Sequence, residues 1–160
     1  MTNSGADDQP DLAILLAASY RVVVDRLQEA MADDDLAAMR PTYGFVIRAV
    51  DAEEPTVGRL AELLEVTKQA ASRLADDMEK HGFLERVADP ADRRRQRLRL
   101  TTMGRRVRKR ALGVSEALEA ELVDAVGPRD AAALRRALLA LVTSGGALED
   151  VLAKRAKPVW

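Results

Sequence analysis

Three consecutive arginines, Arg93, Arg94 and Arg95, have the most distinctive chemistry of any segment in this sequence, and Arg97 follows closely. Residues 88–92, just before them, contain the Asp and Pro side chains that are typical of turns. Guanidinium groups on such a loop can bind phosphates, or can enter a DNA minor groove where the negative potential is enhanced. We expect at least one arginine to enter the groove, with Arg94 as the first candidate and Arg93 as the second.

A second polar group precedes the arginines, between Thr67 and Arg73. On a helix, Gln69 can pair with adenine and Arg73 with guanine or a phosphate, while Ser72 can donate to or accept from either base. Thr67 and Lys68 would stand at the start of that helix, where backbone amides also favour phosphates. The alternative interpretation is an ordinary solvated helix face.

The residues around these groups predict the elements that carry them. Apolar residues at helical spacing lie between Thr67, a typical N-cap, and Gly82, a typical residue after a helix end. A shorter helix begins at Thr56, and a tight link to the next helix makes the pair a helix-turn-helix. Apolar residues around Leu84 and Leu98 predict two short strands on either side of the arginine loop. A helix-turn-helix followed by a basic hairpin is what a winged DNA-binding unit needs, with the second helix in the major groove.

The net charge of −1 conceals an asymmetry along the chain. Residues 1–55 hold 4 basic and 11 acidic side chains, whereas residues 56–110 hold 15 basic and 8 acidic ones. A basic middle segment predicts a local surface for a polyanion. The alternative is a set of solvated helix faces that happen to be rich in arginine. We assign to such a face the basic residues Arg105, Arg106, Arg108, Lys109 and Arg110, although Arg105 is within reach of a phosphate.

Other titratable residues of the second helix have structural interpretations. Asp76 and Asp77 fit a DNA contact poorly, and we expect them to pair with Arg73 or Lys80 or to lie on the surface of the lobe. His81, the only histidine, stands just before the glycine that ends the helix. A protonated imidazole suits the negative end of the helix dipole there.

The expected fold is mainly α with a small β wing: a winged helix-turn-helix flanked by N- and C-terminal dimerisation helices. Residues 1–9 form a flexible tail, 10–55 the N-terminal helices for dimerisation and support, 56–101 the DNA-binding lobe, and 102–160 the C-terminal dimerisation helices. The acidic run 33–35 ends the first helix or caps the next, and Gly127-Pro128 ends the helix that begins at Thr101 or Thr102. The lobe is too small to cover the apolar stripes of these helices, so we expect them to pack against a second copy of the chain.

Three segments carry a resemblance to a known family: Leu60-Ala61-Glu62-Leu63-Leu64, Thr67-Lys68-Gln69-Ala70-Ala71-Ser72-Arg73-Leu74, and Gly82-Phe83-Leu84-Glu85-Arg86. The wing adds the pattern D-x-R-x-x-x-[apolar]-x-L-T, from Asp92 to Thr101. In these segments the sequence resembles the multiple-antibiotic-resistance-repressor (MarR) family of winged helix-turn-helix regulators. The resemblance implies a homodimeric transcription regulator that binds double-stranded DNA, commonly a repressor released by a small phenolic or anionic ligand. It also implies that Asp92 and Arg94 stabilise the wing.

A ligand site is expected where the dimerisation helices meet the winged lobe, as in this family. Aromatic rings and guanidinium groups in that region suit an aromatic anion. The candidates are Tyr20, Arg21, Arg40, Tyr43 and Arg48. In the alternative interpretation, Tyr20 and Tyr43 are core aromatics whose hydroxyl groups have partners.

The composition argues against several other classes of function. The chain has no cysteine and one histidine, so we expect no metal site and no cofactor. It has no phosphate-binding glycine loop or nucleophile elbow, so we do not expect an enzyme. No apolar run is long enough to cross a membrane and no signal pattern is present, so we expect a cytoplasmic protein without a membrane partner. Two other readings stay open: a ligand-independent DNA-binding regulator or activator, and a winged-helix protein-interaction module.

Overall fold

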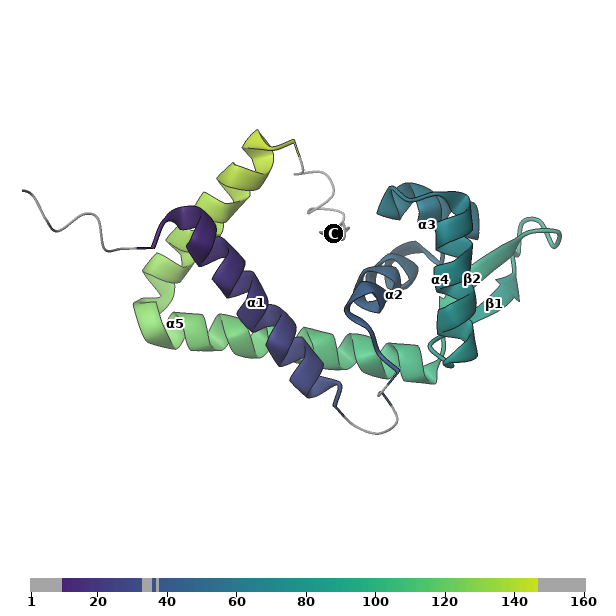
Figure 1. Cartoon of the computed structure of the whole chain (residues 1–160), viewed down its shortest axis with the longest axis horizontal. Coiled ribbons are helices and arrows are strands. Elements are labelled where there is room, and N and C mark those ends of the chain that lie inside the picture. The colour runs from purple at the N-terminus through teal and green to yellow at the C-terminus, as the bar shows by residue number, and fades with distance from the viewer. Residues whose placement is uncertain (1–9, 33–35, 37, 147–160) are drawn as a thin grey trace, which may run out of the picture.

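The computed structural model describes residues 10–32, 36 and 38–146. Its elements are the helices α1 (Leu12–Ala30), α2 (Pro41–Glu53), α3 (Val57–Leu64) and α4 (Lys68–Lys80), the strands β1 (Leu84–Ala88) and β2 (Gln96–Leu100), and the helix α5 (Thr102–Ser144). A lobe of α2, α3, α4 and the hairpin stands at one end of α5, and α1 crosses the other part of α5 (Figure 1). The predicted mainly α fold with a two-stranded wing is confirmed. The predictions for residues 1–9, 33–35 and 147–160 lie outside the described residues.

Three threonine side chains begin the helices that matter most for function. The Oγ1 atoms of Thr56, Thr67 and Thr101 accept hydrogen bonds from backbone N–H groups three residues later, at 3.2, 3.1 and 3.1 Å. Each bond satisfies an amide that has no partner inside its helix. The helices of the helix-turn-helix therefore begin where the sequence predicts, and α5 begins after Thr101.

The wing is an antiparallel hairpin in which Leu84 pairs with Leu100 and Ala88 with Gln96. This register places Leu84, Leu98 and Leu100 on one face of the hairpin, and all three are buried. The backbone N–H of Leu98 also donates to the carbonyl of Pro55 at 2.9 Å, in the segment between α2 and α3. The base of the wing is therefore attached to the lobe through both side chains and backbone.

The core of the lobe lies between α2, α3, α4 and the hairpin. Helix α4 contributes Ala71, Ala75 and Met78, which are fully buried. Tyr43 of α2 and Phe83, just before β1, are also fully buried, and their rings meet edge to face with centroids 5.8 Å apart. One buried face thus fixes the rotation of α4 about its axis and leaves its opposite face exposed.

Helix α5 is interrupted where the sequence predicts a helix end, at Gly127-Pro128. The helical segment runs from Thr102 to Ser144, but it consists of two helices that meet at a kink. Gly127 has φ 79° and ψ 159°, a region of backbone conformation that is essentially confined to glycine. Pro128 is tolerated in the first turn of the segment that follows, because the backbone N–H that proline lacks would have no partner inside the helix there. The glycine therefore ends the first helix of α5, and a second helix begins after it in a new direction.

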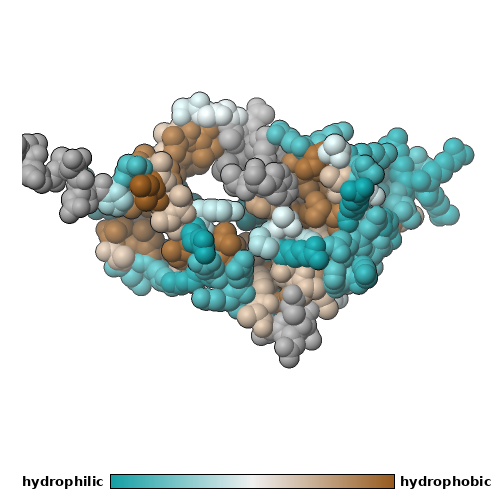
Figure 2. Space-filling model, viewed as in Figure 1, coloured by the Kyte–Doolittle hydropathy of each residue, from teal (hydrophilic) through white to brown (hydrophobic). Residues whose placement is uncertain are grey.

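The flanking helices leave much of their apolar surface exposed. Among the described residues, the exposed large apolar side chains all belong to α1 and α5: Leu12, Ile14, Leu15, Tyr20, Val22, Val23, Leu112, Val123, Val126, Leu134, Leu138, Leu139 and Leu141. Figure 2 shows these patches in brown over the arms at the left, whereas the wing at the right is hydrophilic. None of the helices in the described part of the chain has the length and apolar character that crossing a membrane requires.

Candidate nucleic-acid interface

The first turns of α4 present polar side chains to solvent. Lys68, Gln69 and Arg73 are exposed and Ser72 is half-buried. The Oγ1 atom of Thr67 caps the helix by accepting from Ala70 N–H, which leaves its own O–H free to donate to a phosphate. No side-chain hydrogen bond or ion pair joins the other four residues to another described residue. The start of α4 therefore carries polar groups that the protomer itself does not use.

The second half of α4 is different, because its carboxylates are paired within the lobe. Asp77 accepts a hydrogen bond from the Tyr43 hydroxyl at 2.5 Å and lies 3.2 Å from Arg40 Nη1. The bond from Tyr43 is the largest of the contributions that lower the pKa of Asp77. Asp76 pairs with Arg86 at 2.5 Å. The predicted partners, Arg73 and Lys80, form none of these bonds, because the actual partners come from α2 and β1.

The base of the wing loop is organised around Asp89, which is 7% exposed. Its carboxylate accepts from Arg97 Nε at 2.8 Å and from the backbone N–H of Ala91 at 2.8 Å. These bonds, that of Arg97 first, lower the pKa of Asp89. Arg97, one of the predicted DNA contacts, is thus already bound to a carboxylate at the base of the loop. Only its remaining N–H groups are free for a DNA phosphate.

At the tip of the wing, Asp92 accepts from the backbone N–H of Arg94 at 3.0 Å and lies 3.5 Å from Arg95 Nε. Asp92 thus contacts two residues of its own loop, as the expected wing-stabilising role requires. Arg94 takes part in these contacts only through its backbone N–H. The side chains of Arg93 and Arg94 are exposed and have no hydrogen bond or ion pair with another described residue. They are therefore the two guanidinium groups of the tip that remain available.

Of the basic residues at the start of α5, Arg105, Arg106 and Lys109 are exposed, as the sequence predicts, whereas Arg108 and Arg110 are partly buried. Arg105 also donates to the carbonyl of Leu100 at 2.7 Å. Arg108 pairs with Asp51 of α2 at 2.8 Å. Arg110 donates to the carbonyl of Ala30, at the end of α1, at 3.0 Å. These three side chains join α5 to the wing, to α2 and to α1.

The five ligand candidates are dispersed over the protomer. Tyr43 is a core residue with a bonded hydroxyl, which matches its alternative interpretation, and Arg40 pairs with Asp77. Tyr20 and Arg21 lie on the exposed surface of α1. Arg48 has no hydrogen bond or ion pair to another described residue, and burial of its guanidinium, together with nearby Arg108, lowers its pKa.

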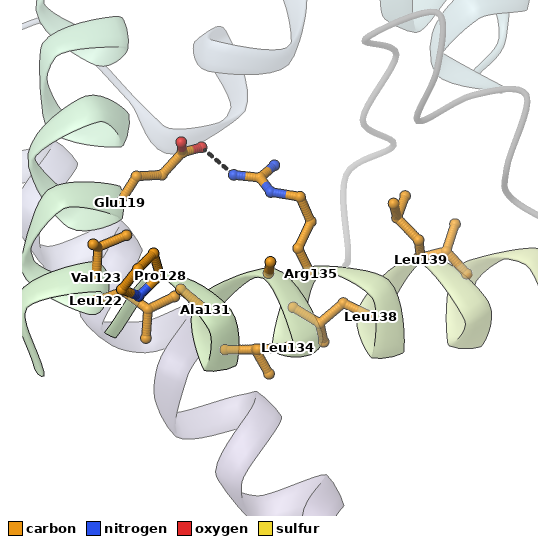
Figure 3. Close-up of a pocket in the computed structure, with 11 residues that line it drawn as sticks. Glu119, Leu122, Val123, Pro128, Ala131, Leu134, Arg135, Leu138 and Leu139 are labelled. Carbon is orange, nitrogen blue, oxygen red and sulfur yellow. Dashed lines mark ion pairs between the residues drawn. The ribbon is translucent and has the colours of Figure 1, made fainter. Parts of the chain in front are cut away.

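Two cavities lie elsewhere. One, of about 490 Å³, occupies the concave side of the α5 kink (Figure 3). It is lined mainly by apolar side chains, and Glu119 and Arg135 pair across it at 2.9 Å. The other, of about 280 Å³, lies between Asp51, Glu54 and Arg99, with Leu100 and Arg105 completing it. None of the five ligand candidates lines either cavity.

A metal site is not evident in the part of the chain that the structure describes, where no three His, Cys, Asp or Glu side chains are grouped to hold an ion. His81 is the C-cap of α4, as predicted, and its Nδ1 lies 2.7 Å from the carbonyl of Asp77. The acidic run 33–35 lies outside the described residues.

The comparisons with known proteins agree with this geometry. Residues 39–95, which contain α2 to α4 and most of the wing, match the model of the MarR family. Over this segment the chain is similar to the MarR family. This is a family of transcription regulators, and its winged helix-turn-helix fold is the fold found here. A search of curated protein sequences gives no match.

Several solved structures share this MarR fold. FabT from Streptococcus pneumoniae, solved in complex with DNA, is 21% identical with a TM-score of 0.72, covering 87% of this chain and 95% of FabT. A MarR family protein from Bacillus stearothermophilus is 20% identical with a TM-score of 0.68, covering 84% and 93% of the two chains. MepR from S. aureus, bound to ethidium bromide, is 18% identical with a TM-score of 0.62, covering 84% and 96%. At these identities the likeness establishes the fold.

Proposed function

We propose that this chain is a homodimeric transcription regulator of the MarR type, which binds a near-palindromic operator and represses transcription. One observation carries the proposal: polar side chains that have no partner in the lobe lie both on the first turns of α4 and at the tip of the wing. Carboxylates of the same helix, such as Asp76 and Asp77, are by contrast paired within the lobe. The likeness to FabT, which was solved with DNA, supports this reading.

Each group then has a role on the duplex. Gln69, Ser72 and Arg73 contact base edges in the major groove, where such side chains discriminate between base pairs. Thr67 and Lys68 contact phosphates at the start of the helix. In the wing, Arg94 or Arg93 enters the minor groove. Arg95 and Arg97, which also bind Asp92 and Asp89, supply backbone contacts.

The flanking helices supply the dimer interface. Exposed apolar side chains cover α1 and both arms of α5, and the cavity inside the α5 kink adds a concave apolar surface. Exposed apolar area of this extent favours association, and two-fold pairing is the commonest closed arrangement. A dimer presents two lobes to one duplex, with half-sites roughly 10 bp apart centre to centre. Because DNA is the partner, we infer that the protein acts in the cytoplasm.

Release by a small aromatic or anionic ligand is the regulation we propose. Arg48 supports it, since this exposed arginine has no carboxylate partner among the described residues. MepR, which shares the fold, was solved with the aromatic cation ethidium. Such a ligand acts only if it binds the DNA-incompetent state more tightly than the DNA-bound state.

A gel-shift assay on the DNA upstream of the chain's own gene tests the proposal. We expect a saturable complex that competitor DNA of unrelated sequence does not remove, and that phenolic acids dissociate. A complex that persists through a wide panel of such acids supports a ligand-independent regulator instead. Failure to bind any specific duplex overturns the DNA-binding function and leaves the protein-interaction module.

A further inference from the structure

Arg86 occupies an unexpected place in the wing. It lies on β1 opposite Leu98, on the face of the hairpin that carries the buried leucines. Its side chain is only 21% exposed. An apolar residue is the usual choice for such a position, because burying a charge is costly unless the charge is paired. The presence of arginine there therefore points to a specific partner.

The partners are two carboxylates of the recognition helix. Arg86 Nη2 lies 2.5 Å from Asp76 Oδ1, and Nη1 donates to Glu79 Oε2. Asp76 and Glu79 are three residues apart and so lie on one side of α4. The planar guanidinium has several N–H donors in a fixed arrangement, so that one side chain can hold both groups, as a lysine ammonium cannot in the same geometry. We call this set of two ion pairs the Arg86 bridge.

Attraction of DNA does not explain the Arg86 bridge. Its three ionised groups carry a net charge of −1, which repels a duplex. The wing is also attached to the lobe through the core leucines, through the bond from Leu98 N–H to Pro55, and through the ion pair of Arg99 with Glu54 at the end of α2. The bridge adds an attachment from the middle of β1 directly to α4, the helix that would read the major groove.

We propose that Arg86 is a positioning residue: through Asp76 and Glu79 it holds the wing at a fixed angle to α4. The inference rests on the proposed DNA-binding function. A wing held in this way delivers Arg94 to the minor groove when Arg73 is in the major groove. A wing that moves freely must first be ordered when DNA binds. This ordering costs conformational entropy and reduces the affinity that the contact of Arg94 contributes.

Two variants remove the Arg86 bridge from opposite sides. Arg86→Met keeps an apolar stem against the hairpin, and the two carboxylates that it leaves unpaired, Asp76 and Glu79, are 59% and 39% exposed and so remain hydrated. Asp76→Asn/Glu79→Gln keeps the arginine and makes the lobe more positive. Electrostatic attraction alone predicts tighter DNA binding by this second variant, so it separates positioning from charge.

The matched control is Arg59→Met. Arg59 also pairs with two carboxylates, Glu53 at 2.7 Å and Glu62 at 3.0 Å, but it joins α2 to α3 and does not contact the wing. It changes charge and ion pairing as Arg86→Met does, without loosening the hairpin.

The readout on DNA is the loss of affinity caused by Arg94→Ala in each background. In the parent protein and in Arg59→Met we expect a loss of about tenfold. In Arg86→Met and in Asp76→Asn/Glu79→Gln we expect this loss to shrink to about twofold or less, because the wing no longer reaches the groove reliably. A full tenfold loss in both bridge variants overturns the proposal. A merely structural role would lower the melting temperature and leave this difference between backgrounds unchanged.

A second readout does not need DNA. The chain has no cysteine, so Lys68→Cys and Ala91→Cys allow one spin label on α4 and one on the wing loop. With labelled protein diluted in unlabelled protein, the label distances should be narrowly distributed in the parent and in Arg59→Met, and broader in both bridge variants. Label distances that are distributed equally narrowly in the parent and in both bridge variants overturn the proposed positioning role of Arg86. If the parent protein binds no DNA, or if Arg94→Ala costs nothing in it, the proposed function fails, and the label distances still decide the role of Arg86.

Discussion

At the scale of single residues, the polar side chains of the lobe form two groups: those that are bonded to another residue of the lobe and those that have no partner there. The threonine caps at Thr56, Thr67 and Thr101 are predictable, because the amides they bind lie three residues away in sequence. The partner of Asp77 is not, because Tyr43 is brought to it by the packing of α2 on α4. Arg86 was missed for the same reason, although its spacing from Leu84 on the core face of a strand was a usable indication.

The first prediction concerns the two unpartnered arginines. Arg73→Ala and Arg94→Ala should each weaken operator binding by ~1–3 kcal/mol, because each removes a groove contact that no intramolecular bond replaces. Fluorescence anisotropy at moderate, fixed salt measures the change. Arg59→Ala is the control, since Arg59 is already paired with Glu53 and Glu62. Unchanged affinity in Arg73→Ala or Arg94→Ala would show that the interface is misassigned.

The second prediction concerns pH and Asp89. The bonds from Arg97 and Ala91 lower the pKa of Asp89 in the folded protein. Its stabilising effect is therefore fully present above the ordinary Asp pKa of about 3.9, and is lost as the pH falls through the lower folded pKa. Asp89→Asn should melt at a lower temperature than the parent at pH 6, and the two melting temperatures should converge towards pH 3. A gap that stays constant over this range would contradict the assigned pairing.

At the scale of elements, short local patterns predicted α3, α4 and the two strands of the wing, and the family resemblance supported the wing. The helix end at Gly127-Pro128 was also predictable from local sequence, whereas the direction in which a second helix follows depends on packing. The partial burial of Arg108 and Arg110 in α5 was not predicted. Their partners, such as Asp51 and the carbonyl of Ala30, belong to helices far away in sequence.

The third prediction concerns the junction of α5 with the wing. A Cβ atom added at Gly104 would lie 2.2 Å from the carbonyl oxygen of Phe83, which belongs to the backbone and already accepts from Thr101 N–H. Gly104→Ala should therefore reduce the free energy of unfolding by ~1–3 kcal/mol, as overpacking does. Urea denaturation measures this loss.

Gly113→Ala is the control in the same helix, because nothing lies within 4 Å of the added Cβ. It should raise the free energy of unfolding by ~0.5–1 kcal/mol through helix propensity. Equal effects of the two substitutions would contradict the packing described at Gly104.

At the scale of the whole molecule, the apolar surfaces of α1 and α5 and the polar surface of the lobe lie at opposite ends of the protomer (Figures 1 and 2). The sequence indicated this division through its apolar stripes and its basic middle segment. It could not indicate which side chains would remain exposed, since that depends on the way α1 crosses α5. The division suits a molecule that pairs through its arms and binds DNA through its lobes.

The fourth prediction follows from that division. Leu138, 38% exposed on the second arm of α5, lines the concave cavity. Leu138→Glu should convert a dimer into a monomer at micromolar concentration, because the charge would be buried without a partner. Sedimentation velocity distinguishes the two species. Ala88→Glu adds the same charge on the exposed wing strand and should leave the dimer intact, whereas a parent protein that is already monomeric would refute the paired arrangement.

Selection of bound duplexes from a random pool, followed by footprinting of the enriched sequence, shows whether the protein reads DNA as a dimer with two winged lobes. The proposed dimer should enrich an inverted repeat with half-sites roughly 10 bp apart, and should protect the major groove of each half-site and the flanking minor grooves. Binding should weaken steeply as salt rises. Failure to enrich any sequence, or enrichment of a single unrepeated site protected in one groove, would contradict the account.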